Sequence, residues 1–322
     1  MTLPIDLQTA INQQLVGISQ TEIAGEAKNI SLRYRGDIAS EKYIDTRMGA
    51  LAYAVTRMPA TYSAVYKALF YALECMKPNP SPISLLDVGA GTGTVLWAAN
   101  ELLNVDSIVC LERSKEMISL GEALAKSSDN ILSNIVWKNT NILTDTIENR
   151  SDYVVASYIF NEIETDSQTK IMRKLWEATK VMLLIVEPGT KEGYMNLMRL
   201  RSTLLEENAY IIAPCPHGEN CPLPEDDWCH FTCRVERSRM HRLSKGGEAP
   251  YEDEKFSFLA FTREKTDLSG SRVLRHPYIG EGYIKLKLCS IAGLAEKTYT
   301  KRDKEKYKEA RKVSSGDLFI TT

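Results

Sequence analysis

The spacing of hydrophobic residues changes near residue 80. Between Thr61 and Met76 the apolar residues recur at intervals of three and four, which places them on one face of a helix. We therefore expect an N-terminal helical region over residues 1–80. Three prolines between Pro78 and Pro82 follow it, and because proline fixes φ and lacks an amide donor, they predict a stiff connector and a domain boundary.

Beyond the connector, residues 81–200 alternate short apolar runs with amphipathic segments. Strands are predicted at ISLLDVG, SIVCLE, NIVWKN, DYVVASYI and VMLLIVEP, and helices at residues 93–103, SKEMISLGEALAKS and TKIMRKLWEATK. Such alternation is typical of βαβ units. The sequence therefore predicts an α/β fold with a parallel, Rossmann-like sheet that helices cover on both faces.

A stretch rich in proline and cysteine, APCPHGENCPLPEDDWCHFTC, interrupts this alternation and predicts an inserted module over residues 201–255. Two further apolar runs, KFSFLAFT and YIKLKLCS, lie within residues 256–295. We expect these runs to be the final two strands of the core, paired antiparallel with each other at the edge of the sheet. Residues 296–322 are expected to form a basic C-terminal tail.

The composition is that of an ordinary globular protein, with 43% hydrophobic residues, 25% charged residues and a formal net charge of -2. This balance excludes a uniformly basic nucleic-acid binder, but the basic residues are concentrated in the C-terminal third. One cluster runs from Arg234 to Lys245, and another from Lys297 to Lys312. The second cluster is expected either to bind RNA together with the first or, because its lysines alternate with acids, to form a solvated helix whose charges pair with one another.

The N-terminus has neither the apolar stretch of a secretory signal nor the Arg-rich bias of a mitochondrial presequence. Apolar runs also stay well below the roughly 20 residues that a membrane span needs. We therefore expect a cytoplasmic protein without membrane contact. In the cytosol, the seven cysteines are expected to be reduced thiols or metal ligands rather than disulfides.

A glycine-rich loop, DVGAGTG, follows the first predicted strand and opens a helix. Glycines permit a tight turn and the close approach of a ligand, and free helix N-terminal amides face that ligand. Glu112 ends the next strand about 20 residues later, where an acid can hold ribose hydroxyls. The loop matches the first motif of class I methyltransferases better than the GxGxxG of dehydrogenases, so we expect S-adenosylmethionine rather than NAD, with a purely structural turn as the alternative. The cofactor-binding candidates are Asp87, Gly89, Ala90, Gly91, Gly93, Glu112 and Asn141.

Polar residues follow the third and fourth predicted strands, at the carboxyl edge where ligands bind in open α/β sheets. Asn139 and Asn141 could contact an adenine there, or belong to an ordinary polar loop. Asn161 and Glu162 lie where methyltransferases keep substrate-facing residues and are the catalytic candidates, although a helix cap explains both equally well. The sequence identifies no general base.

Cys215, Cys221 and Cys229 form a C-x5-C-x7-C pattern in the inserted module. Three soft ligands in a polar, proline-broken stretch indicate a metal site, whereas free cysteines packed as small hydrophobes are the alternative. A closed zinc site or a four-cysteine iron–sulfur cluster needs a fourth ligand. The spacing does not choose among Cys233, His217, His230 and Cys289.

Taken together, these blocks resemble the small-ribosomal-subunit assembly methyltransferases, a family represented in mitochondria by methyltransferase-like protein seventeen and by yeast small-subunit protein twenty-two. The likeness rests on LLDVGAGTG, IVEPGTKEGY, APCPHGENCPL, WCHFTCRVERSRMHRLSKGG and YEDEKFSFLAFTR, which span most of residues 80–290. It implies a Rossmann-like methyltransferase fold, association with the assembling small subunit and a four-iron, four-sulfur cluster. The ligands would then be Cys215, Cys221, Cys229 and Cys289, with Cys233 outside the cluster. The missing presequence suggests a bacterial relative.

Three functions are compatible with these features. The protein would be an S-adenosylmethionine-dependent methyltransferase-like protein that acts on, or binds, ribosomal RNA during small-subunit assembly. Alternatively, it is a non-catalytic assembly factor, or a methyltransferase for a small molecule or a protein. Zinc remains the alternative to the iron–sulfur cluster. The RNA-binding candidates are Arg234, Arg237, Arg239, Arg242 and Lys245.

Overall fold

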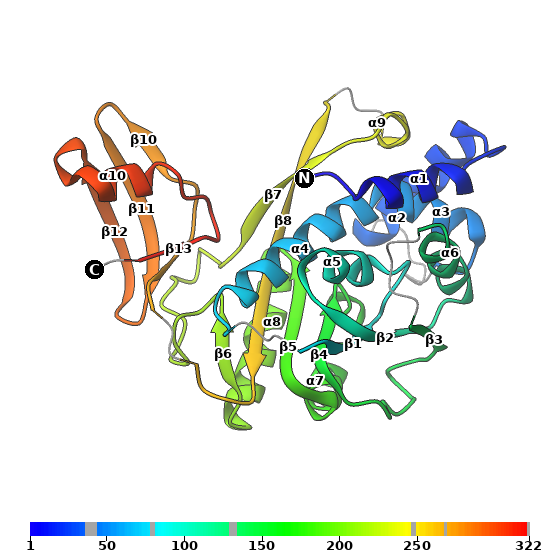
Figure 1. The fold of residues 1–322 in the computed structure, drawn as a ribbon, viewed down its shortest axis with the longest axis horizontal. Coiled ribbons are helices and arrows are strands. Elements are labelled where there is room, and N and C mark those ends of the chain that lie inside the picture. Colours follow the sequence, from blue (N-terminus) through cyan, green and yellow to red (C-terminus); the bar gives the residue numbers. More distant parts are fainter. Residues whose placement is uncertain (36–43, 78–80, 129–133, 246–248, 267–268, 321–322) are drawn as a thin grey trace.

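The computed structural model describes residues 1–35, 44–77, 81–128, 134–245, 249–266 and 269–320, except for the side chains of residues 33–35 and 244–245. Within these residues, a mixed eight-stranded sheet carries helices on both faces, and a five-stranded sheet stands beside it (Figure 1). The C-terminal residues form the second sheet at one end of the molecule, and the first helices of the chain lie at the other end (Figure 1).

The N-terminal region is helical, as the sequence predicts. Its helices pack on the main sheet and share one hydrophobic core with it, because α4 contacts β5, β7 and β8. The predicted boundary near residue 80 therefore does not separate two cores, and the connector at residues 78–80 lies outside the described residues. The helices are α1 (Ile5–Gln14), α2 (Gln20–Arg35), α3 (Arg47–Thr56) and α4 (Met58–Leu73).

The main sheet has the strand order β3-β2-β1-β4-β5-β8-β6, and β7 also pairs with β8. Strands β1 to β5 run parallel, whereas β5, β6 and β7 pair antiparallel with β8. This order confirms the predicted Rossmann-like parallel sheet. The order reverses between β1 and β4, so a crevice is expected at the carboxyl ends of these strands. The strands are β1 (Ile83–Val88), β2 (Val105–Glu112), β3 (Ile135–Asn139), β4 (Ser151–Ser157), β5 (Thr179–Pro188), β6 (Tyr210–Ala213), β7 (Phe231–Glu236) and β8 (Tyr251–Thr262).

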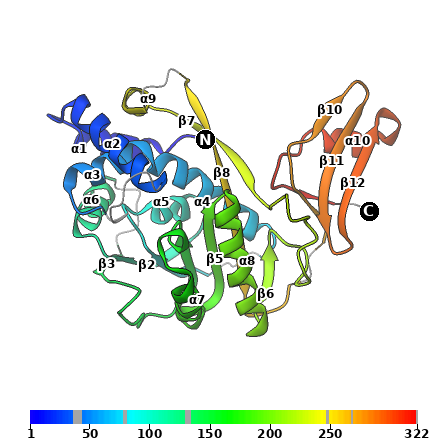
Figure 2. The same ribbon diagram turned by 180° about the vertical axis from the view of Figure 1, so that it is seen from behind.

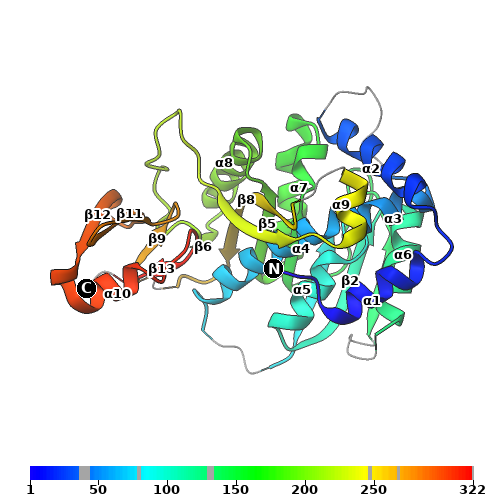
Figure 3. The same cartoon turned by 90° about the horizontal axis from the view of Figure 1, so that it is seen from above.

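Helices cover both faces of the main sheet, because successive strand residues point to opposite faces. In β1, Leu85 packs in the core beneath α4, α5 and α6, whereas its neighbour Leu86 packs against α7 and α8. Figures 2 and 3 show α7 and α8 on one side of the sheet, and Figure 3 shows α4 and α5 on the other. The helices that follow the strands are α5 (Thr94–Leu102), α6 (Lys115–Lys126), α7 (Thr165–Ala178), α8 (Lys191–Glu206) and α9 (Arg239–Lys245), with the 3-10 turn η1 (Phe160–Glu162).

The C-terminal residues form a second sheet of order β10-β11-β9-β13, with β12 paired to β11. Ile284, Leu286 and Leu288 of β11 point to one face, where they pack with Ala310 and Phe319 in a small core of their own. The helix α10 closes this face. The elements are β9 (Ser271–Val273), β10 (Tyr278–Gly280), β11 (Tyr283–Ser290), β12 (Gly293–Thr300), the turn η2 (Lys301–Asp303), α10 (Lys304–Ala310) and β13 (Leu318–Phe319).

The second sheet corrects two expectations. The run KFSFLAFT belongs to β8 and pairs with β5, whereas YIKLKLCS is β11 and pairs with β10, β9 and β12. The two runs do not pair with each other, because β8 is buried between β5 and β6 while the alternating pattern of β11 serves the separate small core. Residues 296–322 are not a tail either, since β12, α10 and β13 fold into this sheet.

The inserted module is shorter than predicted. Residues 201–255 include the end of α8, the strands β6 and β7, α9 and the start of β8. Its irregular part is the segment 214–230, here called the cysteine loop, which connects β6 to β7. Proline and cysteine composition located this loop, but the strands on either side of it belong to the main sheet.

Candidate cofactor pocket and cysteine cluster

The glycine loop has the tight turn that its motif predicts. Gly89, Gly91 and Gly93 have φ angles of 72°, 56° and 85°, a region that residues with a Cβ rarely adopt. A Cβ at Gly89 would overlap Cγ2 of Ile159. A side chain would therefore be strained at all three positions and would also overlap Ile159 at Gly89, and the loop opens α5 at Gly93.

Glu112 ends β2 at the predicted place and contacts the loop. Its Oε2 accepts a hydrogen bond from the Gly91 amide at 2.9 Å, and its Oε1 accepts one from the Ser114 amide at 2.8 Å. A carboxylate offers about four acceptor positions, so two stay available for hydroxyl donors. Glu112 thus orders the loop and keeps acceptor capacity for a ligand.

Asp87, near the end of β1, is fully buried behind the loop. Neither of its carboxylate oxygens has a hydrogen-bond partner among the described residues. Burial raises the pKa of this carboxyl well above its usual value, and the nearby charge of Glu112 raises it further. Because an unsatisfied buried carboxyl is costly, a positively charged or hydrogen-bond-donating ligand group would stabilise it.

A cavity of about 130 Å³ lies beside the glycine loop. Ligand cavities usually measure roughly 300–1,000 Å³, so this pocket must widen to admit a nucleoside cofactor. Among the other candidates, Ala90 is buried in the core and Gly93 begins α5. The predicted residues that line the cavity are Gly89, Gly91, Glu112, Asn141 and Glu162.

The two asparagines after β3 have different contacts. The amide of Asn139 donates to the carbonyls of Glu112 and Arg113 at 3.2 and 2.7 Å, so it supports the end of β2. Asn141 lines the cavity, and its Oδ1 accepts a hydrogen bond from the Leu143 amide at 3.1 Å. Asn141 is therefore the better placed of the two for a ligand contact.

The two catalytic candidates after β4, Asn161 and Glu162, also have different surroundings. The Oδ1 of Asn161 accepts a hydrogen bond from Asn196 of α8 at 2.7 Å, so its side chain is engaged away from the cavity. Its backbone amide donates to the buried carboxylate of Glu187 at 3.2 Å. Burial raises the pKa of Glu187 to about 8. Glu162 lines the cavity and is the candidate that faces it.

Two tyrosines that the sequence analysis did not select also line this pocket. Tyr158 follows β4 with a φ of 61°, which is rare for a bulky residue, and its hydroxyl donates to Glu254 of β8 at 3.0 Å. Tyr53 reaches the pocket from α3. Strained residues cluster at functional sites, but neither tyrosine carries a signal in its sequence context.

The four cysteines that the resemblance selects line one common cavity, together with Tyr194 and His217. Burial raises the pKa of Cys229 well above its usual value, and the neighbouring thiols of Cys215, Cys221 and Cys289 raise it further. Burial also raises the pKa of Cys289 to about 12. Within the described part of the chain, no group of three or more His, Cys, Asp or Glu side chains is arranged to hold a metal ion.

Of the four alternatives for a fourth metal ligand, two line this cavity and two do not. Cys289 and His217 line the cavity, with Cys289 Sγ 4.0 Å from His217 Nε2. Cys233 is buried on β7 opposite Glu254, and burial raises its pKa to about 12. His230 stacks on Trp228, with ring centroids 5.3 Å apart, and does not line the cavity.

Arg201 and Asp227 hold the cysteine loop against its surroundings. Arg201 on α8 donates to the carbonyls of His217 and Glu219, and its charge opposes the rise that burial causes in the pKa of Cys215. Asp227 accepts a hydrogen bond from Lys287 of β11 at 2.7 Å and pairs with Arg275. The loop is therefore joined to α8 on one side and to the second sheet on the other.

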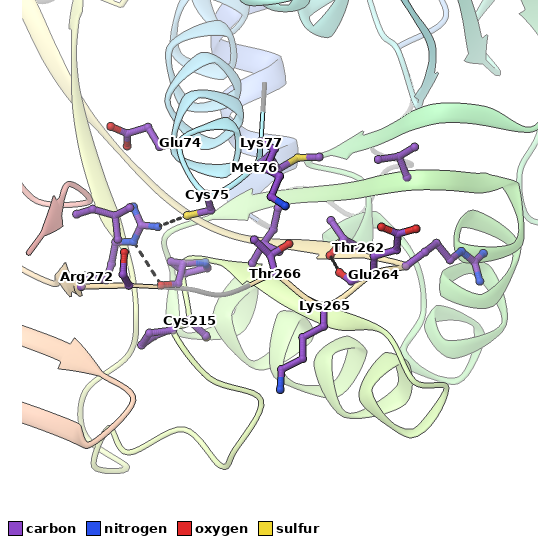
Figure 4. A pocket seen from close by; sticks show the side chains of 18 of the residues that line it. Glu74, Cys75, Met76, Lys77, Cys215, Thr262, Glu264, Lys265, Thr266 and Arg272 are labelled. Atoms are coloured by element: carbon purple, nitrogen blue, oxygen red, sulfur yellow. Dashed lines mark hydrogen bonds between the residues drawn. The ribbon is translucent and has the colours of Figure 1, made fainter. Parts of the chain in front are cut away.

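Arg272 on β9 makes a third junction, and it is 1% exposed. It donates to the carbonyl of Gly316 at 2.7 Å, to the carbonyl of Pro214 at 3.3 Å and to the sulfur of Cys75 at 3.3 Å, and Figure 4 shows the bond to Cys75. Its guanidinium thus connects the end of α4, the start of the cysteine loop and the C-terminal segment.

A larger cavity, of about 650 Å³, opens near Arg272 and Cys215 (Figure 4). It is lined by the starts of β4 and β5 and by the end of β8, at the amino edge of the parallel strands. Ligands of open α/β sheets bind at the opposite, carboxyl edge. The smaller cavity beside the glycine loop is therefore the candidate cofactor site.

The arginine candidates are partly paired within the protein. Arg234 contacts Asp253 at 2.9 Å and Arg237 contacts Glu252 at 2.7 Å, and both acids lie on β8. Arg239 is exposed on α9 and Arg242 is partly exposed, while the side chain of Lys245 lies outside the described residues. In α10, ion pairs join Lys306 to Glu309 and Lys308 to Glu305, which confirms the expected self-pairing.

Comparison of the sequence with known protein families gives a match over most of the chain. Residues 47–320 match the model of the family described as mitochondrial small ribosomal subunit Rsm22, and the chain belongs to that family. It is similar to the human ribosome assembly protein METTL17, mitochondrial, with 26% identity over 294 residues, covering 84% of this chain and 62% of that protein. It is also 23% identical to the Schizosaccharomyces pombe Rsm22-cox11 tandem protein 2, mitochondrial, covering 98% of this chain and 50% of that protein. The chain thus spans less than two thirds of these relatives.

Solved structures with similar folds include magnesium protoporphyrin IX methyltransferase from Synechocystis PCC 6803, at 12% identity, a TM-score of 0.43 and coverage of 73% of this chain and 90% of that one. Ribosomal protein L11 methylase from Lactobacillus delbrueckii is 16% identical with a TM-score of 0.35, covering 59% of this chain and 76% of that one. Among the described helices, none has the length and apolar character to cross a bilayer.

We expect Arg272→Met to lower the free energy of unfolding by about 3 kcal/mol, because the carbonyls of Pro214 and Gly316 would lose their buried, charged donor. Arg234→Met is the matched control, since Arg234 is 61% exposed in its pair with Asp253 and should cost less than about 1 kcal/mol. Urea unfolding of both variants measures the difference. Equal losses would contradict the structural role of Arg272.

Proposed function

We propose that this chain is an S-adenosylmethionine-binding, methyltransferase-like protein that acts on, or binds, ribosomal RNA during assembly of the small ribosomal subunit. The observation that carries the proposal is the family match over residues 47–320, which includes the glycine loop and the cysteine loop. The family description names the mitochondrial small ribosomal subunit, and the human relative is named as a ribosome assembly protein. The chain spans less than two thirds of these relatives, so we propose its activity and its partners rather than infer them from the family match alone.

The proposed cofactor lies between the glycine loop and Glu112. Glu112 would accept the ribose hydroxyls with its two free acceptor positions, and Asn141 would contact the adenine. Asp87 would lie behind the positively charged part of the ligand, while the backbone of Ala90 and Gly93 would shape the turn. S-adenosylmethionine supplies a methyl group on a sulfonium, which a nucleophile can accept. The support is the turn geometry and the unpartnered Asp87.

A non-catalytic assembly factor is the second candidate, and one observation favours it. Asn161 is engaged with Asn196 of α8, which leaves Glu162 as the catalytic candidate that lines the pocket. In such a protein the cofactor would stabilise the fold on which the RNA-binding surface depends. Glu162 would then contact the ligand without performing any chemistry.

We also propose that Cys215, Cys221, Cys229 and Cys289 hold a four-iron, four-sulfur cluster, with zinc as the alternative metal. The four thiols share one cavity, and neighbouring thiols help to raise the pKa of Cys215, Cys229 and Cys289, so a metal that neutralises thiolates fits the chemistry of this set of donors. Arg201 would balance part of the remaining negative charge. The role would be structural, because metal binding contributes to folding and the ligands come from the cysteine loop and from β11.

The location of the protein stays a prediction. We expect the cytoplasm, whereas the relatives described above carry mitochondrial names. We propose that Arg239 and Arg242 on α9 make the phosphate contacts of the arginine cluster, since Arg234 and Arg237 are paired with acids of β8. Lys245 follows them in the sequence and extends the same basic segment.

Gly91→Arg should abolish the binding of S-adenosylmethionine, because its side chain would fill the turn that receives the ligand. Glu112→Ala should weaken binding roughly tenfold, through loss of hydrogen bonds to the ribose. Gly293→Arg is the matched control, since Gly293 also has a positive φ and its Cβ would meet open space. Isothermal titration calorimetry measures the affinity of each variant for S-adenosylmethionine. Undiminished binding to the Gly91 variant would remove the cofactor assignment, and selective binding of NAD would favour a dehydrogenase.

Cys289→Ser should lose the metal, whereas Cys233→Ser should keep it, because Cys233 lies on β7 outside the shared cavity. Iron and acid-labile sulfide are measured on protein purified without oxygen, with circular dichroism as the folding control. Stoichiometric zinc without sulfide would overturn the iron–sulfur assignment. Loss of metal in the Cys233 variant and not in the Cys289 variant would overturn the choice of fourth ligand.

Sedimentation with small ribosomal subunits tests the proposed function. The wild type should co-sediment, and the double variant Arg239→Glu/Arg242→Glu should dissociate at lower salt, because each lost phosphate contact reduces affinity and salt dependence. Lys126→Glu/Lys170→Glu makes the same charge change on α6 and α7 and should bind normally.

A wild-type protein that stays free of subunits at low salt would refute the function. Transfer of labelled methyl groups to the same particles then distinguishes an enzyme from an assembly factor.

A further inference from the structure

The outer face of the second sheet carries an exposed pair of aromatic rings. Tyr278 of β10 and Tyr283 of β11 have ring centroids 6.0 Å apart, with an angle of 34° between their planes. Tyr278 is 60% exposed. In β11 the apolar Ile284, Leu286 and Leu288 face the small core beneath α10, so the alternating Tyr283, Lys285 and Lys287 face outward. Figure 3 shows α10 on one side of β11 and β12.

Local geometry holds the Tyr283 ring in place. Gly280 lies directly opposite Tyr283 in the β10–β11 register, and a Cβ at Gly280 would overlap the Tyr283 ring. The absence of a side chain there lets the ring lie flat over the neighbouring strand. A platform that is ordered in advance loses little conformational entropy when a planar ligand stacks on it.

Basic residues lie beside the two rings. Lys285 lies directly opposite Tyr278, and the Lys301 amide donates to the carbonyl of Gly282 at 3.3 Å, in the turn between the two tyrosine-bearing strands. Two acids lie nearby: Glu281 is in the turn between the two tyrosine-bearing strands, and Glu296 on β12 contacts Lys285 at 3.8 Å in an exposed and therefore weak pair. Of the 40 Lys and Arg and the 42 Asp and Glu in the chain, residues 269–322 hold twelve and six. The second sheet is thus the basic part of an otherwise acidic protein.

We propose that this outer face, centred on Tyr278 and Tyr283, binds single-stranded RNA by stacking bases on the two rings. Proteins that bind single strands combine aromatic platforms with a positively charged track for the backbone, and both are present here. Lys285, Lys301 and the adjacent Arg302 would contact phosphates. The proposal rests on the proposed association with ribosomal RNA, and it adds a contact separate from the arginines of α9.

Lys287 continues the same face toward the cysteine loop, where it pairs with Asp227 at 2.7 Å, and Cys289 follows two residues later on the strand. The RNA surface and the proposed cluster therefore share one strand. An ordered cysteine loop would fix the orientation of β11 and of the rings that it carries.

The test is binding of full-length protein to a fluorescent oligouridine of about 12 nucleotides, measured by anisotropy. The wild type should bind, and Tyr278→Ala/Tyr283→Ala should lose roughly tenfold in affinity for each ring removed. Tyr278→Phe/Tyr283→Phe keeps both rings and should bind within about threefold of the wild type. Ile291→Ala, at an isoleucine that is 80% exposed in the β11–β12 turn, should bind normally. Thermal unfolding confirms that each variant is folded.

Wild-type affinity in the double alanine variant, or no oligouridine binding by the wild type, would overturn the proposal. Sedimentation with subunits separates this failure from failure of the proposed function. If the tyrosines are needed for subunit association while protein-free RNA does not bind, the surface contacts a protein and the RNA proposal is wrong. If the wild type binds oligouridine through its tyrosines but never associates with subunits, the RNA surface stands and the proposed function fails.

Discussion

The buried guanidinium of Arg272 is the contact on which the arrangement of the molecule depends. It donates to the end of α4, to the first residue of the cysteine loop and to the segment before β13, so it joins three parts that are distant in sequence. Burying a charge is costly, and these acceptors together with the Tyr71 ring, 5.6 Å from the guanidinium carbon, offset that cost. Arg201 and Asp227 add two more junctions at the same loop. The cysteine loop is therefore where the main sheet and the second sheet meet.

The proposed functions divide between these two sheets. The candidate cofactor pocket lies at the carboxyl ends of β1 to β4, where Glu112 and the glycine loop are held by hydrogen bonds within the main sheet. The basic surface with Tyr278 and Tyr283 lies on the second sheet. A cluster ligated by three cysteines of the loop and by Cys289 of β11 would connect the two. Ligand binding, RNA binding and metal binding would then all depend on the same folded arrangement of the two sheets.

Much of the main sheet could be predicted, because parallel strands buried on both faces appear as uninterrupted apolar runs. The pattern could not say which sheet a strand joins. A run such as that of β11 alternates in the same way whether it pairs with β8 or builds a separate small core, and the difference depends on the distant partners Ala310 and Phe319. The error of assigning residues 296–322 to a tail has the same origin.

The site was predicted unevenly for similar reasons. Motif spacing located the glycine loop and Glu112, because the strand, turn and helix are contiguous in sequence. It could not separate Asn141 from Asn139, since both follow the same strand and only the three-dimensional contacts distinguish them. Spacing left four choices for the last metal ligand, and only the family resemblance preferred Cys289. Arg201, Tyr53 and Tyr158 gave no local signal, because their roles arise from tertiary contacts.

Amide hydrogen exchange of the protein with and without the proposed metal tests most directly whether the cysteine loop joins the two sheets. The account predicts that residues 214–230 and β11 lose protection when the metal is removed, while β1 and β2 keep theirs. The contacts of Arg272, Arg201 and Asp227 would remain, but without the metal they would hold the second sheet less firmly against the core. Unchanged exchange in β11, or an equal loss of protection in β1 and β2, would contradict the account.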